Sequence, residues 1–269
     1  MKHSVLLAFL LVSCAAQQSA PVVQPVAQAQ CNPGLALVNA ALWVQSSAEY
    51  RANALQTYGE ARRALDALVA TTGDKPPAVV LDLDETALAN NPYEARMIKA
   101  GKTYDEKAWQ QWTNEAAATA VPGAAEFLTY ARSRGVTPFY VTNRNASEKS
   151  AVRTMLQKLG YPLDANEDQL LMRSERPEWT AADKTSRRDY IAQRYRILLL
   201  LGDDLNDFTA AAGKSLAERE ALVRDNASKW GTTWFILPNP MYGSWEAAMT
   251  AGGGTPCDQL NRKIEALKP

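Results

Sequence analysis

The feature that most constrains this chain is a short apolar run that ends in paired carboxylates. Residues Ala78-Val79-Val80-Leu81 lead directly into Asp82-Leu83-Asp84-Glu85-Thr86. An apolar run of this length is typical of a buried strand, so the carboxylates lie where that strand leaves its sheet. In open α/β sheets this edge is the crevice that binds ligands. We therefore expect a parallel sheet with an acidic site at its carboxyl edge.

Strands and helices alternate along the chain beyond this point. The all-aliphatic run Ile197–Leu201 is typical of a central parallel strand that is covered on both faces. The pattern predicts a doubly wound, mainly parallel α/β sheet. Apolar runs predict strands at 79–82, 138–142, 169–172, 197–202 and 233–237, and helices near 122–134, 146–159, 184–194 and 215–229.

The N-terminus carries the pattern of an export signal. Lys2 precedes an apolar stretch at 5–11, and Leu11-Val12-Ser13-Cys14 resembles a bacterial lipobox. Residues 1–13 are therefore expected to be a lipoprotein signal peptide, with Cys14 lipidated and the protein attached to a membrane through the lipid alone. Ordinary signal cleavage nearby is the alternative. No other apolar run is long enough to span a bilayer.

A folded domain is expected over 32–269, after a flexible tether at 14–31. Asn32-Pro33 predicts the start of an N-terminal helix over 33–70. The core covers 78–86 and 120–240. The intervening 87–119 predict a small helical cap over the carboxyl edge, and its aromatic residues either face a ligand or fill the cap's own core.

Composition excludes several kinds of chemistry. The formal net charge is zero, so nothing indicates binding to a nucleic acid polymer. The single histidine, His3, lies in the predicted signal peptide, which leaves no histidine for a catalytic triad or a zinc site. Cys31 and Cys257 form a disulfide in an exported protein or remain two buried thiols.

Four polar elements follow the predicted strands in an order that favours phosphoryl transfer. Asp82 and Asp84 come first, then Thr142, Lys184 and Asp203. A carboxylate nucleophile at Asp82 divides hydrolysis into two displacements through an aspartyl-phosphate. Asp84 would protonate the leaving oxygen and then activate water. Lys184 and Thr142 would bind the phosphoryl oxygens, and Asp82 and Asp203 would hold Mg²⁺.

Other interpretations of these residues were weighed. A calcium loop starting at Asp82 fails because Ala87 and Tyr93 occupy the positions that require glycine and glutamate. Arg144 and Arg187 are expected either to contact phosphate or to be surface charges. A non-catalytic surface lipoprotein is the alternative outside the enzymes, although the chain keeps both the nucleophile and the metal aspartate.

The combination resembles the haloacid dehalogenase superfamily: Asp-x-Asp-x-Thr, a strand-end threonine, an isolated lysine and then Gly202-Asp203-Asp204-Leu205-Asn206-Asp207. With the export signal, the N-terminal helix and Asn239-Pro240-Met241-Tyr242-Gly243-Ser244-Trp245, it looks like the class C bacterial acid phosphatases. Their lipoprotein branch comprises outer-membrane 5′-nucleotidases. The expected location is therefore the outer membrane, the periplasm or the cell surface.

The resemblance implies further roles. Mg²⁺ would be held by the side chains of Asp82 and Asp203 and the backbone carbonyl of Asp84, with Asp207 supporting a metal-bound water. Helix capping is the alternative for Asp207. The family hydrolyses nucleoside monophosphates and often forms homodimers; a broad phosphomonoesterase is the alternative. Tyr242 and a cap tryptophan, Trp109 or Trp112, would stack on the base. Asp204 departs from the asparagine common in this motif.

Overall fold

Five parallel strands form the central sheet of the computed structural model, which describes residues 31–250 and 253–269. The predicted signal peptide, Cys14 and the predicted tether up to residue 30 lie outside the described residues. All four strand pairs of this sheet are parallel, which confirms the predicted α/β class. The spatial order is β5 (Leu170–Arg173), β4 (Thr137–Asn145), β1 (Pro77–Leu81), β6 (Arg196–Gly202) and β7 (Trp234–Ile236).

The register of the central strands explains why the polar motifs meet. Leu81, the last residue of β1, pairs with Tyr140 of β4 and with Leu201 of β6. The residues that follow on each strand therefore leave the sheet at one edge, as the ends of parallel strands do. The backbone N–H of Asp82 still donates to the carbonyl oxygen of Leu201 at 3.0 Å, which fixes the start of the acidic loop.

Alternate residues of β1 face two separate hydrophobic cores. Val79 and Leu81 pack in the core that contains α2 (Ala48–Val69), α5 (Ala124–Ser133) and α6 (Lys149–Lys158). Ala78 and Val80 pack in the core that includes Ile191 of α7 (Thr185–Ala192). Successive strand residues point to opposite faces, so an apolar run buries both. This is the two-sided covering that the unbroken apolar strands predict.

The N-terminal helical region is divided rather than continuous over 33–70. It forms η1 (Pro33–Leu37), α1 (Val38–Ser46) and α2. Ser47 is extended, with ψ of 141°, and its hydroxyl accepts from the N–H of Tyr50 at 3.0 Å. A serine that caps a helix start in this way ends the preceding helix. The apolar pattern of α1 and α2 alone does not reveal the break.

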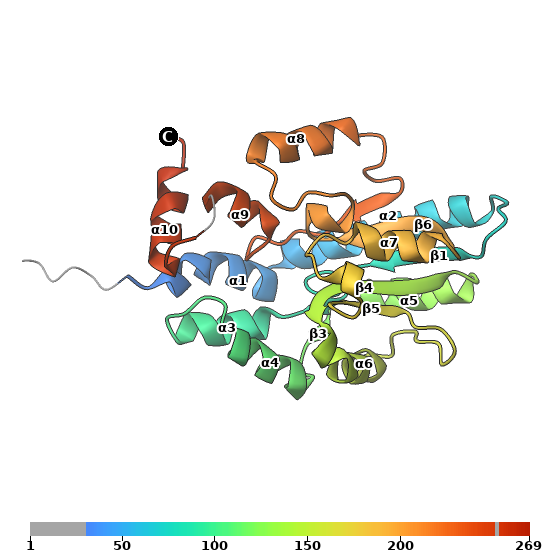
Figure 1. The fold of residues 1–269 in the computed structure, drawn as a ribbon, viewed down its shortest axis with the longest axis horizontal. Helices are drawn as coiled ribbons and strands as arrows, with labels where there is room; N and C mark the ends of the chain where they lie inside the picture. The colour runs from blue at the N-terminus through green and yellow to red at the C-terminus, as the bar shows by residue number, and fades with distance from the viewer. Residues whose placement is uncertain (1–30, 251–252) are drawn as a thin grey trace, which may run out of the picture. The chain divides into compact units, whose positions relative to one another are not determined.

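Two helices fill the insertion that follows the acidic loop. β2 (Leu88–Ala89) and β3 (Thr119–Ala120) pair antiparallel and close its base. Between them lie α3 (Asn91–Lys99) and α4 (Glu106–Glu115). In Figure 1, α3 and α4 lie together on one side of α1, and α3 contacts α1. Here we call residues 90–118 the helical insertion.

The remaining elements lie after β4, β5 and β6 and near the C-terminus. Each of these strands is followed by a short 3-10 helix: η2 (Ala146–Glu148) after β4, η3 (Pro177–Trp179) after β5 and η4 (Leu205–Asp207) after β6. The chain ends with α8 (Leu216–Asp225), α9 (Ser244–Thr250) and α10 (Pro256–Glu265), of which α9 and α10 were not predicted. α10 contacts η1, so the last helix packs against the start of the folded region.

Two further findings bear on the location of the protein. Cys31 and Cys257 are both disulfide-bonded, which is typical of proteins outside the cytoplasm. Their pairing with each other stays a prediction. Among the helices of 31–250 and 253–269, none has the length and apolar character needed to cross a bilayer.

Tyr58 of α2 gives a test of how the helical layer supports the acidic loop. Its buried hydroxyl donates to the carbonyl oxygen of Thr86 at 2.7 Å. Tyr58→Phe would leave this carbonyl unpaired and is expected to lower the free energy of unfolding by about 1–3 kcal/mol. Chemical denaturation measures this change. Tyr130→Phe, which removes an exposed hydrogen bond to Asp66, is the control and should change stability by less than about 0.5 kcal/mol. Equal effects would contradict the prediction.

Candidate active site

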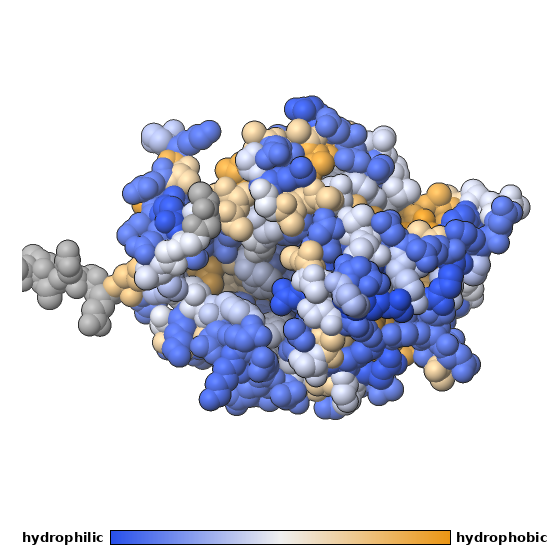
Figure 2. Space-filling view, in the orientation of Figure 1, coloured by the Kyte–Doolittle hydropathy of each residue, from blue (hydrophilic) through white to orange (hydrophobic). Residues whose placement is uncertain are grey.

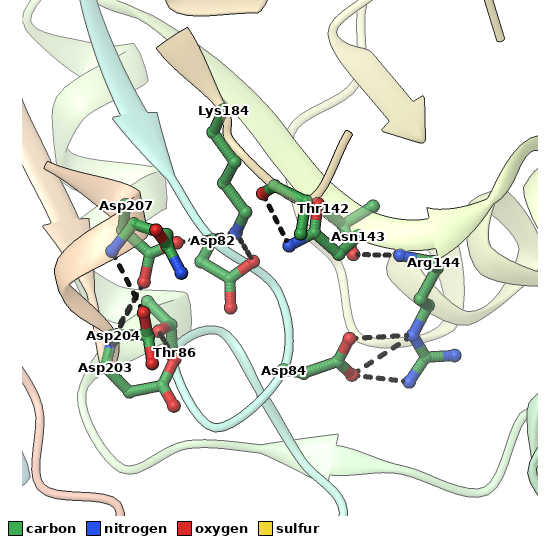
Figure 3. Close-up of polar contacts among 12 residues, drawn as sticks. Asp82, Asp84, Thr86, Thr142, Asn143, Arg144, Lys184, Asp203, Asp204 and Asp207 are labelled. Carbon is green, nitrogen blue, oxygen red and sulfur yellow. Dashed lines mark hydrogen bonds and ion pairs between the residues drawn. The ribbon is translucent and has the colours of Figure 1, made fainter. Parts of the chain in front are cut away.

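Asp82 lies at the centre of the carboxyl edge, directly after β1. The residue is buried, and its carboxylate forms an ion pair with Lys184. Lys184 occupies the N-cap position of α7 and is also buried. Its ammonium nitrogen contacts Asp207 Oδ1 at 2.6 Å as well. One lysine therefore bridges carboxylates that follow two different strands (Figure 3).

The two carboxylate oxygens of Asp207 make different contacts in the loop after β6. Its Oδ2 accepts from the backbone N–H groups of Asp203 at 3.1 Å and Asp204 at 2.9 Å, so the residue does cap η4. Its Oδ1 faces Lys184. Gly202 is required beneath it, since a Cβ atom there would lie 2.2 Å from Asp207 Oδ2. Capping and membership of the acidic cluster are thus compatible.

Three carboxylates converge in this region. Oxygens of Asp82, Asp203 and Asp207 all lie within 4.8 Å of one another. Burial, together with the charges of Asp207 and Asp84, raises the pKa of Asp82 to about 7, although Lys184 opposes the shift. Burial and the charges of Asp207 and Asp82 raise the pKa of Asp203 well above its usual value. The cluster therefore holds more negative charge than Lys184 alone balances.

Neighbouring side chains fix the orientation of Asp203. Thr86, the last residue of the Asp-x-Asp-x-Thr motif, donates its hydroxyl to Asp203 Oδ1 at 3.2 Å. Asn239 donates its amide to Asp203 Oδ2 at 2.8 Å. The threonine of the motif thus orients an aspartate more than a hundred residues later in the chain. Both contacts leave the carboxylate lone pairs near Asp82 and Asp207 available.

Asp84 points away from the cluster, toward the helical insertion (Figure 3). Arg144 contacts both of its carboxylate oxygens, with Nη2 at 2.8 Å and Nε at 3.1 Å from Oδ1. Asn90 donates its amide to the same Oδ1 at 2.8 Å. Trp112 in turn donates its indole N–H to Asn90 Oδ1 at 2.9 Å, which fixes the amide orientation. The carboxylate is held in place by groups from the insertion and from β4.

Arg144 and Arg187 were expected either to contact phosphate or to be surface charges. The second expectation is wrong. Both residues are buried. Arg187 contacts the backbone carbonyl of Thr142 and the side chain of Asn143 at 2.7 Å. The carboxyl end of β4 is thereby held against α7. The position of Arg144 near the end of a predicted strand indicated that it lies close to the site. No sequence pattern indicated that it binds Asp84, nor that Asn90 does.

The remaining residues of the predicted site lie around this centre. Thr142 is buried, and its hydroxyl accepts from the N–H of Arg144 at 3.1 Å, so its contact with phosphate stays a prediction. Asp204 is engaged by Ser244, whose hydroxyl and N–H both donate to it at 2.6 Å. This contact holds the Asn239–Trp245 segment beside the site. The carboxylate of Asp204 is therefore hydrogen-bonded to Ser244 rather than unpaired beside the acidic cluster.

Two adjoining cavities open at the sheet edge. The smaller, of about 300 Å³, is lined by the acidic cluster and Lys184 and is here called the phosphate cavity. The larger, of about 400 Å³, is here called the leaving-group cavity. Asp84, Asn143 and Tyr242 line both, so the cavities meet at the predicted proton donor. In Figure 2 this face is hollowed between α9 and α10 on one side and α3 and α4 on the other.

The two candidate tryptophans have different surroundings. Trp112 is buried and bonded to Asn90, so its indole belongs to the core of the insertion. Trp109 lines the leaving-group cavity together with Tyr104 and Tyr242, and the Arg144 guanidinium lies 4.8 Å from its ring centre. Tyr242 donates its hydroxyl to Glu85 Oε1 at 3.2 Å. These aromatic faces form the walls of the larger cavity.

Comparison with known proteins identifies the family. The profile of the HAD superfamily, subfamily IIIB (acid phosphatase), matches residues 4–245. The chain belongs to this family of acid phosphatases. Membership confirms the predicted family and the predicted enzyme class, a phosphomonoester hydrolase.

Solved structures agree with this assignment. The class C acid phosphatase of Bacillus anthracis is 35% identical, with a TM-score of 0.82, and the match covers 88% of this chain and 99% of that one. The same enzyme with tungstate bound matches equally well. The stem 31 kDa glycoprotein of Glycine max is 24% identical over 166 residues, which cover 61% of this chain but only 58% of the plant protein.

The donor set of this acid phosphatase fits a hard divalent cation. Its acidic cluster offers carboxylate oxygens from two buried aspartates and one half-buried aspartate. Oxygen ligands of this kind suit Mg²⁺, which also keeps several of its waters. Burial, together with the charges of neighbouring carboxylates, raises the pKa values of Asp82 and Asp203. A cation would relieve the repulsion among these carboxylates.

Replacing Gly202 by alanine should displace Asp207, because the new Cβ would overlap its side chain. A displacement of about 1 Å costs on the order of 100-fold in rate, which assays of phosphate release would show. Gly59→Ala is the control, since its Cβ would meet nothing closer than Arg63 at 3.9 Å. In the interior of α2 it should raise stability by about 0.5–1 kcal/mol without changing activity. Full activity in Gly202→Ala would refute the packing argument.

Mg²⁺ should stabilise the folded protein against heat. At a hundredfold excess over its Kd a ligand adds about 2.7 kcal/mol, or roughly 5–10 °C in Tm for a chain of this size. Differential scanning fluorimetry with Mg²⁺ and with EDTA measures the shift. Asp203→Asn should lose most of it while being no less stable without metal, because it removes a repelling charge. Asp225→Asn, at an exposed position outside the cluster, should keep the full shift. An undiminished shift in Asp203→Asn would place the metal elsewhere.

Proposed function

We propose that this protein hydrolyses phosphomonoesters, preferentially nucleoside monophosphates, through an aspartyl-phosphate formed on Asp82. The observation that carries the proposal is the junction of the two cavities. A carboxylate cluster with one lysine lines the phosphate cavity, and an aromatic-walled space of about 400 Å³ adjoins it at Asp84. The first suits a phosphoryl group, and the second suits an organic leaving group.

In the first displacement, the carboxylate of Asp82 attacks phosphorus and the ester oxygen departs. Lys184 offers a cation next to the attacking carboxylate, within the phosphate cavity. Mg²⁺ held by the side chains of Asp82 and Asp203 and the carbonyl of Asp84, with Asp207 behind a water, would supply charge neutralisation. The tungstate complex of the Bacillus anthracis enzyme supports an oxyanion site, since tungstate is tetrahedral like phosphate.

Asp84 serves as the proton donor in this mechanism. It stands at the junction of the cavities, where the leaving oxygen must be. Arg144 and Asn90 hold its carboxylate from two sides, so its reacting oxygen is positioned before substrate binds. After the alcohol leaves, the same carboxylate removes a proton from the water that hydrolyses the acyl phosphate. One residue therefore acts first as acid and then as base.

The preference for nucleotides is supported by the walls of the leaving-group cavity. Trp109 and Tyr242 both line it, and a nucleobase stacks well on aromatic rings. Lipid attachment at Cys14, location at the outer membrane and formation of a homodimer are also proposals. They rest on the resemblance described above. The disulfide-bonded cysteines support only the broader statement that the protein acts outside the cytoplasm.

The test is phosphate release from 5′-AMP and from p-nitrophenyl phosphate by the purified protein, with Mg²⁺ and with EDTA. We expect turnover of both, with the higher kcat/KM for AMP. EDTA and Asp82→Asn should each lower the rate at least about 1,000-fold, because each removes an element of the covalent route. Rapid acid quenching should detect phosphate on the wild-type chain and none on Asp82→Asn.

The controls separate the alternatives. Asp74→Asn lies outside both cavities and should retain activity. Turnover of the aryl phosphate with no preference for AMP would indicate a broad phosphomonoesterase. Failure on both substrates would support the non-catalytic lipoprotein instead.

A further inference from the structure

One acidic residue of the leaving-group cavity has no role in the mechanism above. Glu94, on α3 of the helical insertion, is only 6% exposed and lines this cavity. Its backbone N–H continues the helix by donating to the carbonyl of Asn90. Among residues 31–250 and 253–269, no side chain or backbone group forms a hydrogen bond or ion pair with its carboxylate. A buried polar group of this kind normally has a partner.

The surroundings of Glu94 make its position unfavourable without a ligand. Burial and the charge of Glu246 raise its pKa to about 7. Glu246, which also lines the cavity, is already paired with Lys263. Arg144, the cation near the junction, is engaged by Asp84. Unpaired buried carboxylates destabilise a fold, and such exceptions concentrate at functional sites.

The helix sets the distance between Glu94 and the reacting atoms. Asn90 donates to Asp84, which stands where the leaving oxygen departs. Residues four apart on a helix share a face, with Cβ atoms about 5–6 Å apart. Glu94 therefore lies about one helical turn from Asn90, and it lines the same cavity as Asp84. The hydroxyl groups of a ribose lie a few bonds from its phosphorylated oxygen, which is a comparable reach.

We propose that Glu94 is a specificity-determining residue that accepts hydrogen bonds from hydroxyl groups of the leaving group, the ribose 2′- and 3′-hydroxyls when the substrate is a nucleotide. The inference deepens the proposed function and rests on it. The walls formed by Trp109 and Tyr242 contact any flat apolar group, whereas Glu94 distinguishes leaving groups by their donors. A leaving group without donors would bury this carboxylate unpaired and bind less well for that reason.

The experiment compares kcat/KM for 5′-AMP and 2′,3′-dideoxy-AMP, which differ only in these hydroxyls. Hydrogen bonds to charged groups predict that the wild type prefers AMP by about 10–100-fold. Glu94→Gln keeps the shape of the side chain and should reduce this ratio at least about threefold. Glu94→Ala removes the acceptor and should bring the ratio to about one. Glu220→Gln, at an exposed position outside the cavity, should leave the ratio unchanged.

Thermal unfolding separates recognition from packing. If Glu94 serves the ligand, Glu94→Gln should keep or raise Tm, since it removes an unpaired buried charge. A structural role would instead lower Tm and reduce kcat/KM for both nucleotides alike, with an unchanged ratio. That result overturns the inference, as does a wild-type ratio of about one.

A second pair of substrates distinguishes failure of this inference from failure of the proposed function. Glycerol 3-phosphate and propyl phosphate repeat the contrast in hydroxyl groups without a base. If AMP is no better than glycerol 3-phosphate, the nucleotide preference fails. The hydroxyl recognition still stands if Glu94→Ala abolishes the preference for glycerol 3-phosphate over propyl phosphate, and it falls if that preference is absent or unaffected.

Discussion

The structure depends on one buried ion-pair arrangement, in which Lys184 contacts Asp82 and Asp207 at the end of the sheet. Burial alone would lower the pKa of Lys184, but the charges of Asp207 and Asp82 raise it above its usual value. Without the lysine, the carboxylates after β1 and β6 would repel one another in a poorly solvated space. The ammonium group permits their approach, and the approach creates a site for a cation and a phosphoryl group.

Much of what holds this arrangement comes from outside the two strands. Arg187 and Arg188 of α7 bind backbone carbonyls, of Thr142 on one side and of Asn206 and Asp207 on the other. The helix that follows Lys184 thus also fixes the end of β4 and the segment after β6. On the opposite side, Tyr58 of α2 binds the carbonyl of Thr86. The loops carry the reactive groups, and the helices on both faces limit their movement.

The helical insertion separates the two halves of the chemistry. The phosphate cavity is lined by residues at or after the strand ends, by Lys184 directly before α7 and by Tyr242, Gly243 and Ser244. The leaving-group cavity takes Glu94, Tyr104 and Trp109 from the insertion and further walls from η1 and α10. Substrate range can therefore change through the insertion and the chain ends while phosphoryl transfer is preserved. Asp84 belongs to both halves, and the insertion orients it through Asn90.

The sequence by itself determined the sheet, its order of strands along the chain and the acidic motifs, because apolar runs and the groups that follow them are local patterns. It also indicated that carboxylates, lysine and hydroxyls must perform any catalysis, since His3 is the only histidine. The tertiary structure decided which groups meet. The division of the N-terminal helix comes from the local cap at Ser47, which the apolar pattern does not reveal. Arg144 binding to Asp84 and the burial of Arg187 and Glu94 depend on contacts between distant segments. Such contacts leave no periodic signal, because packing rather than local propensity selects them.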